Sequence, residues 1–205
     1  MYERRSYGFE VRAQEEDAGS VITGSPVVYE SRTDLGWFDE IIRTGALNNA
    51  DLSDVRFLVN HDLSRIPLAR CRGKGGTMQI AVSAKGMDVR VELDTEGNVD
   101  AKALYSAVKR GDISGMSFMF RIDGEEWKNL DSDHPTRIIT EIGAVLEVSA
   151  VTFPAYEATE ISARARDAPQ DAKAALDAAR RANGANLDDK ALLELIKLKA
   201  LYGGM

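Results

Sequence analysis

The sequence predicts a mainly β protein of the α+β class, with short strands that form a β-barrel or sandwich and helices at its periphery. Hydrophobic and polar residues alternate in about seven or eight short segments between residues 7 and 153, which is the period of a β-strand. Two helical patterns interrupt these segments. After residue 162 the composition changes to residues that favour helices, so a C-terminal helical tail is expected.

Composition and charge predict two regions. The 205 residues are 44% hydrophobic and 29% charged, which is enough for a sizeable core. Residues 163–205 carry 8 of the 26 basic and 6 of the 33 acidic residues, a net charge of +2. Residues 1–162 carry the other 18 basic and 27 acidic residues, a net charge of −9. We therefore expect a folded domain over 1–162 and a helical, partly mobile tail over 163–205.

The same features argue against several classes of partner and environment. The net charge of −7 gives no reason to expect nucleic-acid binding. Cys71 is the only cysteine, which excludes an intrachain disulfide and fits a reducing compartment. The first residues do not form a signal peptide, and no hydrophobic run reaches the length of a membrane span. We thus expect neither a membrane nor a nucleic acid as partner.

Strands are predicted in every part of the chain before the tail. They cover Tyr7–Val11, Val21–Ser31, Val55–His61, Ile66–Cys71, Met78–Ala84, Met87–Leu93 and Ile138–Phe153, together with a strand after Gly111. Pro26 places the early part of its strand at an edge or a bulge. Residues 14–19 read as an acidic turn and residues 124–137 as a polar loop.

Helices are predicted over Phe38–Leu47 and Asn98–Arg110. The second has a hydrophobic stripe, a cap at Asn98 or Asp100, and a stop at Gly111; the stripe consists of Ala101, Leu104, Tyr105 and Val108. In the tail, residues 163–183 and 187–202 read as helices without an evident partner surface.

The segment Gly111–Ile122 contains the first candidate for catalysis. Met116, Phe118 and Phe120 alternate with Ser117 and its neighbours, so one face of the strand is apolar and Ser117 lies on the other. A serine beside a glycine on a strand could act as a nucleophile, although a small structural serine is the more common case.

Glu147 is the second candidate, because it is the only charged residue in the apolar run 144–153. An unpaired buried carboxylate costs on the order of several kcal/mol, so Glu147 needs a partner or an open cleft. An ion pair with an arginine and a catalytic role explain it equally well. His61, at the end of the apolar face of its predicted strand, is the candidate partner. Ser117, His61 and Glu147 together would supply the nucleophile, base and orienting acid of a serine hydrolase.

Two other sets of residues are weaker candidates. A cysteine hydrolase that uses Cys71 has no supporting motif around that residue. His134 lies in a hydrophilic loop with Asp131 and Asp133, and such residues are usually solvated. No metal or other cofactor is predicted.

Four segments in order resemble those of the prohead proteases of tailed phages, which are related in fold to herpesvirus assemblin. They are Phe38–Leu47, the strand that ends in Asn60-His61-Asp62, Ile113–Phe120 with its Ser-Gly-x-Ser-Phe pattern, and Leu146–Ala155 with its Glu-Val-Ser-x-Val-Thr pattern. The resemblance extends over residues 7–162. It implies an assemblin-like β-barrel with a serine endopeptidase site.

The resemblance also implies roles and partners. The family's histidine corresponds to His61 and its serine to Ser117, while the acidic member corresponds to Glu147, with Asp62 or Ser149 as alternatives. The substrates would be a scaffold protein or scaffold domain and the major capsid protein, and the enzyme would also cleave itself. It would act in the host cytoplasm, inside the assembling prohead, as a possible homo-oligomer.

Three positions depart from the family pattern: Thr44, Ala69 and Met119. Met119 shares the face of Ser117 and would narrow the site. The alternative function is therefore a non-catalytic capsid-assembly factor on the same assemblin-like fold.

Overall fold

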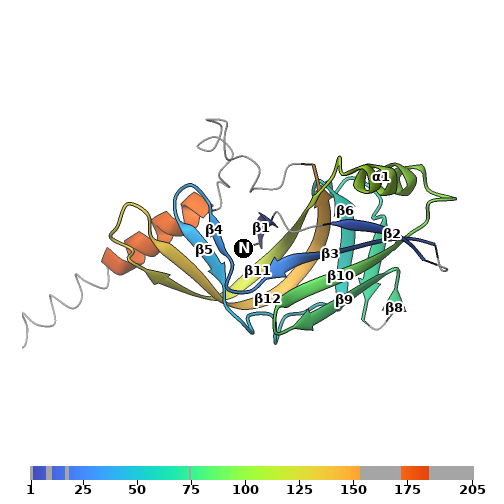
Figure 1. Cartoon of the computed structure of the whole chain (residues 1–205). Coiled ribbons are helices and arrows are strands. Elements are labelled where there is room, and N and C mark those ends of the chain that lie inside the picture. Colours follow the sequence, from blue (N-terminus) through green and yellow to red (C-terminus); the bar gives the residue numbers. More distant parts are fainter. Residues whose placement is uncertain (1, 8–10, 17–18, 74, 153–171, 185–205) are drawn as a thin grey trace, which may run out of the picture.

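The computed structural model describes residues 2–7, 11–16, 19–73, 75–152 and 172–184 as two open β-sheets and two helices (Figure 1). The larger sheet has eight strands. Six follow one another in the order β1 (Tyr2–Tyr7), β11 (Gly115–Lys128), β12 (Thr136–Val151), β6 (Asp54–Val59), β7 (Ala69–Arg72) and β8 (Gly75–Gly76). In addition, β5 (Asp39–Ile42) pairs with β12, and β4 (Arg32–Asp34) pairs with β5. The smaller has four, in the order β2 (Arg12–Glu16), β3 (Gly19–Val28), β10 (Gly86–Leu93) and β9 (Met78–Ser83).

The predicted α+β class with mainly β structure is confirmed, but the described strands do not close into a barrel. One hydrophobic core includes residues of both sheets, among them Ile22 and Val91 from the smaller and Phe57, Phe118 and Phe120 from the larger. Phe118 and Phe120 stack with their ring centroids 4.4 Å apart. Within the described residues, no helix has the length and apolar character needed to cross a membrane.

Helix α1 (Val99–Arg110) is as predicted, including its two ends. The Asn98 side chain accepts hydrogen bonds from the backbone N–H groups of Asp100 and Ala101, and Gly111 takes the left-handed conformation at the C-cap. The four residues of the predicted stripe are all buried. The hairpin of β9 and β10 is also confirmed, and a bulge in the pairing of β10 with β3 lies opposite Pro26, as expected.

The helix predicted over residues 38–47 is wrong. Residues 39–42 form β5, which pairs in parallel with the start of β12. Phe38, Glu40 and Ile42 are buried at alternate positions, which is the strand period. The segment fits a helical pattern almost as well over so few residues, and pairing with β12 decides between the two.

Other predicted boundaries also differ. The first strand is β1, which begins at Tyr2, whereas residues 8–10 lie outside the described residues. Most of the predicted turn at 14–19 belongs to β2 and the start of β3. The predicted loop 124–137 shrinks to residues 129–135, because β11 and β12 continue as a long antiparallel ribbon. We call the part of this ribbon from residue 122 to residue 142 the arm.

Residues 172–184 form a helix that packs on the arm, at the end of the molecule far from α1 (Figure 1). Its Ala172 and Leu176 are buried in a second hydrophobic cluster with Leu35 and Phe38, which Trp127 and Leu130 border. The Arg180 side chain donates to the backbone oxygens of Leu130 (3.2 Å) and Ser132 (2.8 Å). This part of the predicted tail thus has a partner surface, whereas the helix expected over 187–202 lies outside the described residues.

Candidate active site

Three neighbouring strands bring the predicted site residues close together in the larger sheet. Ser117 of β11 is in register with Ser149 of β12, which is in register with Leu58 of β6. The next row along contains Met119 and Glu147. These residues alternate with Phe118 and Val148, which belong to the core, so the site lies on the opposite face of the sheet.

His61 reaches this face through a sharp turn. Strand β6 ends at Val59, and Asn60 and His61 have left-handed φ angles of 52° and 58°. The Asn60 N–H still donates to the Ala150 oxygen, at 2.9 Å, and its side chain bonds to Thr152. The prediction that His61 lies on the apolar face of its strand is therefore wrong, because the turn redirects the side chain.

The structure brings His61 and Glu147 into direct contact. His61 Nδ1 bonds to Glu147 Oε1, while the other carboxylate oxygen, Oε2, accepts a hydrogen bond of 2.6 Å from the Ser149 hydroxyl. The same hydroxyl oxygen accepts the His61 backbone N–H at 3.1 Å. Glu147 and Ser149 are almost fully buried, and 13% of the His61 side chain is exposed. The buried carboxylate thus has the partner that its apolar surroundings require.

This arrangement leaves Nε2 of His61 available to accept a hydrogen bond from another group. Because Nδ1 is engaged by Glu147, a neutral ring that donates from Nδ1 has its lone pair on Nε2. Within the described residues Nε2 has no hydrogen-bond partner. The geometry is that of a base whose ring orientation is fixed by an acid, with Ser149 holding both the acid and the backbone of the histidine.

Ser117 lies one strand away, but its hydroxyl is directed elsewhere. The hydroxyl donates a 2.7 Å hydrogen bond to the backbone oxygen of Arg5 on β1, and Ser117 is fully buried. No hydrogen bond joins Ser117 to His61 in the described part of the chain. The structure therefore brings together two of the three predicted residues and places the third next to them.

The alternatives to Glu147 have other roles in the structure. Asp62 is bound to Ser64 of its own loop, through both the hydroxyl and the backbone N–H, and these bonds hold its pKa below the usual value. Ser149 contacts both the His61 backbone and the Glu147 carboxylate. Met119 is in register with Glu147, on the face of Ser117, as predicted.

Neither weaker candidate gains a catalytic arrangement. Cys71 is buried within the core cluster, and burial raises the pKa of its thiol, which disfavours the reactive thiolate. His134 lies 3.3 Å from Asp39 and 3.7 Å from Asp34. The three side chains could surround a cation, but two of them are exposed, and they are distant in sequence from the His61 motif.

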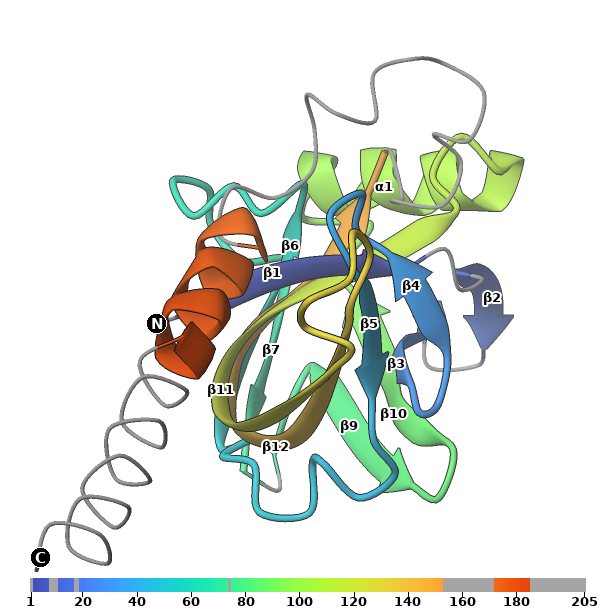
Figure 2. The ribbon, with the colours of Figure 1, turned by 90° about the vertical axis from the view of Figure 1, so that its left-hand side faces the viewer.

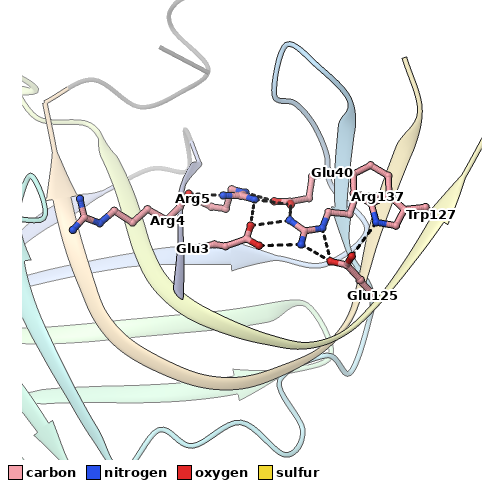
Figure 3. Close-up of polar contacts among 7 residues, drawn as sticks. All are labelled: Glu3, Arg4, Arg5, Glu40, Glu125, Trp127 and Arg137. Atoms are coloured by element: carbon pink, nitrogen blue, oxygen red, sulfur yellow. Dashed lines mark hydrogen bonds and ion pairs between the residues drawn. The ribbon is translucent and has the colours of Figure 1, made fainter. Parts of the chain in front are cut away.

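A second buried polar cluster links β1 to β5 and β12 (Figure 3). Arg5 Nε donates to Glu40 at 2.5 Å, and Arg137 donates to Glu3 at 2.7 and 2.9 Å and to Glu40 at 3.3 Å. Glu125 also accepts from Arg137. Burial alone raises the pKa of Glu3, but the hydrogen bonds and charges of Arg137 and Arg5 outweigh it and hold the pKa below the usual value. We call Glu3, Arg5, Glu40 and Arg137 the charge cluster.

Sequence reasoning missed the charge cluster. The sequence predicts a helix around Glu40 and a loop around Arg137, so it does not predict that either side chain is buried. The alternation of Phe38, Glu40 and Ile42 was the available signal, because it places a carboxylate on the buried face of a strand. The resemblance indicates Ser149 only as a substitute for the acid, and not as a residue that contacts both His61 and Glu147.

Comparison with known proteins identifies the family. A model of the caudovirus prohead serine proteases matches residues 8–173 of this chain. The chain belongs to this family. The resemblance seen in the four sequence motifs is thereby confirmed.

Comparison with individual proteins gives two further matches. The prohead protease of Enterobacteria phage HK97 is 32% identical over 127 residues, which are 60% of this chain and 52% of the relative. The chain thus spans about half the length of the curated relative that it matches. The solved structure of the bacteriophage T4 capsid assembly protease, gp21, matches with a TM-score of 0.38 and 14% identity, over 73% of this chain and 98% of that chain.

Proposed function

We propose that this chain is a serine endopeptidase that cleaves the scaffold and the major capsid precursor during prohead maturation, and also itself. The observation that carries the proposal is the contact of His61 with Glu147 one strand from Ser117. Membership of a family of serine proteases supports the reaction class. The same proposal includes an assemblin-type fold, action inside the assembling prohead and a possible homo-oligomer.

The chemistry follows from the positions of the three side chains. Ser117 Oγ attacks the carbonyl carbon of the scissile peptide, and Nε2 of His61 takes the hydroxyl proton. Glu147 keeps the ring in the required orientation and stabilises the imidazolium that forms. His61 then gives the proton to the leaving amine, and water releases the acyl group by the reverse path.

The division of the chain at residue 162 is also part of the proposal. Residues 1–162 would form the protease domain, while residues 163–205 would dock to the shell or be removed by the protease. The burial of Ala172 and Leu176 against Phe38 suggests that the first part of this tail also stabilises the domain before maturation.

A second candidate function is a non-catalytic capsid-assembly factor. One observation favours it: the Ser117 hydroxyl donates to Arg5 and not to His61. A catalytic test separates the two functions directly.

The test is cleavage of co-expressed capsid precursor by Ser117→Ala and His61→Ala variants. Loss of a nucleophile or base lowers the rate by roughly 10⁶-fold, so both variants should leave the precursor intact. Ser132→Ala, in the exposed loop after β11, is the control and should cleave normally. A serine-reactive fluorophosphonate should label Ser117 in the unaltered chain. Normal cleavage by the Ser117 variant would refute the proposal.

A further inference from the structure

A pocket of about 420 Å³ lies between helix α1 and the loop that joins β6 to β7. In Figure 2 this loop and α1 lie at the same end of the molecule. The volume is within the range of about 300–1,000 Å³ that is typical of ligand pockets. Aliphatic side chains from β6, the loop, α1 and the segment before β11 line most of it, among them Leu58, Ile66, Leu104 and Ile113. We call this cavity the α1 pocket.

The α1 pocket adjoins the candidate active site from two directions. Asn60 and Asp62 line it, and these residues flank His61 in the chain. Ile113 also lines it, four residues before Ser117. Four residues of extended chain span at most about 14 Å. A peptide whose scissile bond lies at Ser117 and His61 therefore has a side chain within four residues of that bond that can reach the pocket.

The polar groups at the rim of the pocket are engaged with one another or with nearby residues. The Asn60 side chain donates to the Thr152 hydroxyl at 3.1 Å and accepts the Thr152 backbone N–H at 3.0 Å. The Arg65 guanidinium lies 3.8 Å from the carboxylate of Asp62 and 3.6 Å from that of Asp100. A polar ligand would have to replace these contacts, whereas an apolar side chain would only remove the aliphatic lining from water.

Ile66 provides a second observation that indicates an apolar ligand. Its side chain is 83% exposed, the highest fraction among the large hydrophobic residues in the described part of the chain, and it forms part of the pocket wall. Exposed apolar surface that is bordered by charged residues is typical of a binding site. A second apolar side chain in the pocket would cover surface that the chain alone leaves in water.

We propose that the α1 pocket binds a large aliphatic or aromatic side chain of the substrate, within four residues of the scissile bond. This inference rests on the proposed function, which gives the chain a peptide substrate. The rim carries two carboxylates and one guanidinium, so its net charge is negative. An acidic side chain at the same substrate position is therefore disfavoured.

Mapping of cleavage sites tests the substrate preference. A trypsin digest of bacterial proteins is incubated with the full-length chain, and the new peptide termini are identified by mass spectrometry. The sites that are cut should share a large apolar residue at one fixed position within four residues of the cut. Cleavage without such a preference would refute the role of the α1 pocket.

Ala103→Leu tests whether the preference arises in this pocket. Ala103 is an exposed residue of α1 that lines the pocket, so the larger side chain fills part of the space. For peptides that the unaltered chain cuts, KM should rise about tenfold with kcat nearly constant, because binding of the apolar side chain is lost. Ala178→Leu, at an exposed position of the helix over residues 172–184, is the matched control. Equal KM values for the two variants would overturn the inference.

Ile66→Ala removes part of the pocket wall and gives a second comparison if Ala103→Leu lowers the stability of the fold. It should raise KM for the same peptides by about threefold to tenfold. Leu63→Ala is the control, because Leu63 is exposed in the same loop but does not line the pocket. Since both side chains are exposed, the two variants should have the same melting temperature. Equal KM values here would also contradict the inference.

A binding measurement separates this inference from the proposed function. In chains that carry Ser117→Ala, N-acetylleucine methylamide should shift the methyl NMR signals of Ile66, Leu104 and Ile113, whereas N-acetylaspartate methylamide should not. If these signals shift but no chain cleaves any peptide, the pocket stands and the protease assignment fails. If peptides are cleaved without an apolar preference and the signals do not move, the protease assignment stands and the pocket is refuted.

Discussion

Two of the carboxylates that the larger sheet buries differ in character: Glu147 in the candidate active site and Glu40 in the charge cluster. Both are almost completely hidden from solvent. Glu147 bonds to an imidazole and a hydroxyl, whereas Glu40 bonds to two guanidinium groups. An imidazole gains and loses a proton near neutral pH, but a guanidinium stays charged. Burial of a carboxylate thus does not by itself indicate a catalytic role. That role depends on the group that the carboxylate contacts.

Among the variants that compare these two carboxylates, Glu147→Gln should have the largest effect. The neutral amide no longer stabilises a positive charge on His61, so kcat should fall by about 10⁴-fold while the fold is retained. Peptide-cleavage kinetics and a thermal melt on the same preparation measure the two effects. Full activity of the Glu147→Gln variant would mean that Glu147 is a structural residue like Glu40.

Glu40→Gln should instead lower the stability of the fold. It leaves Arg5 and Arg137 buried with one negative charge fewer, and breaking a buried ion pair costs roughly 3–5 kcal/mol. The free energy of unfolding from urea denaturation should fall by this amount. The control Glu126→Gln, at an exposed pair, should change it by less than about 0.5 kcal/mol. A Glu40 variant as stable as this control would mean that the charge cluster does not stabilise the fold.

Ser149→Ala should have a smaller effect on the active site. The Ser149 hydroxyl holds both the Glu147 carboxylate and the His61 backbone, so its loss should lower kcat by roughly tenfold to a hundredfold. Because Ser149 is fully buried and its hydroxyl bonds to Glu147 and His61, KM should stay nearly constant. Ser149→Thr retains the hydroxyl and should recover most of the activity. A change in KM alone would assign Ser149 to substrate binding.

The smallest effect is a dependence of stability on pH through Glu3. Its pKa in the folded protein lies below the usual value of 4.5, so its ion pairs stabilise the folded chain fully above pH 4.5. This contribution is lost as the pH falls from 4.5 through the lowered pKa. Denaturation curves between about pH 3 and 7 should therefore converge for the unaltered chain and Glu3→Gln at the acidic end. Parallel curves over this range would show that Glu3 does not contribute.

The sequence by itself determined the elements whose causes are local. The caps and the stripe of α1, the β9–β10 hairpin and the strand that carries Ser117 follow from residues a few positions apart, as does the apolar strand around Glu147. The motif resemblance identified the family and the three candidate residues from the same short segments. Such signals are carried by hydrophobic period, capping side chains and turn residues, which need no distant partner.

Only the tertiary structure decided the partners of buried polar groups. Arg5 and Glu40 are 35 residues apart in sequence, Ser117 and Arg5 are 112 apart, and Arg137 and Glu3 are 134 apart. Residues 39–42 became a strand because β12 lies beside them, and the turn at Asn60 moved His61 off the face that its strand predicted. A buried charge or hydroxyl must find a partner, but the one it finds depends on which strands meet.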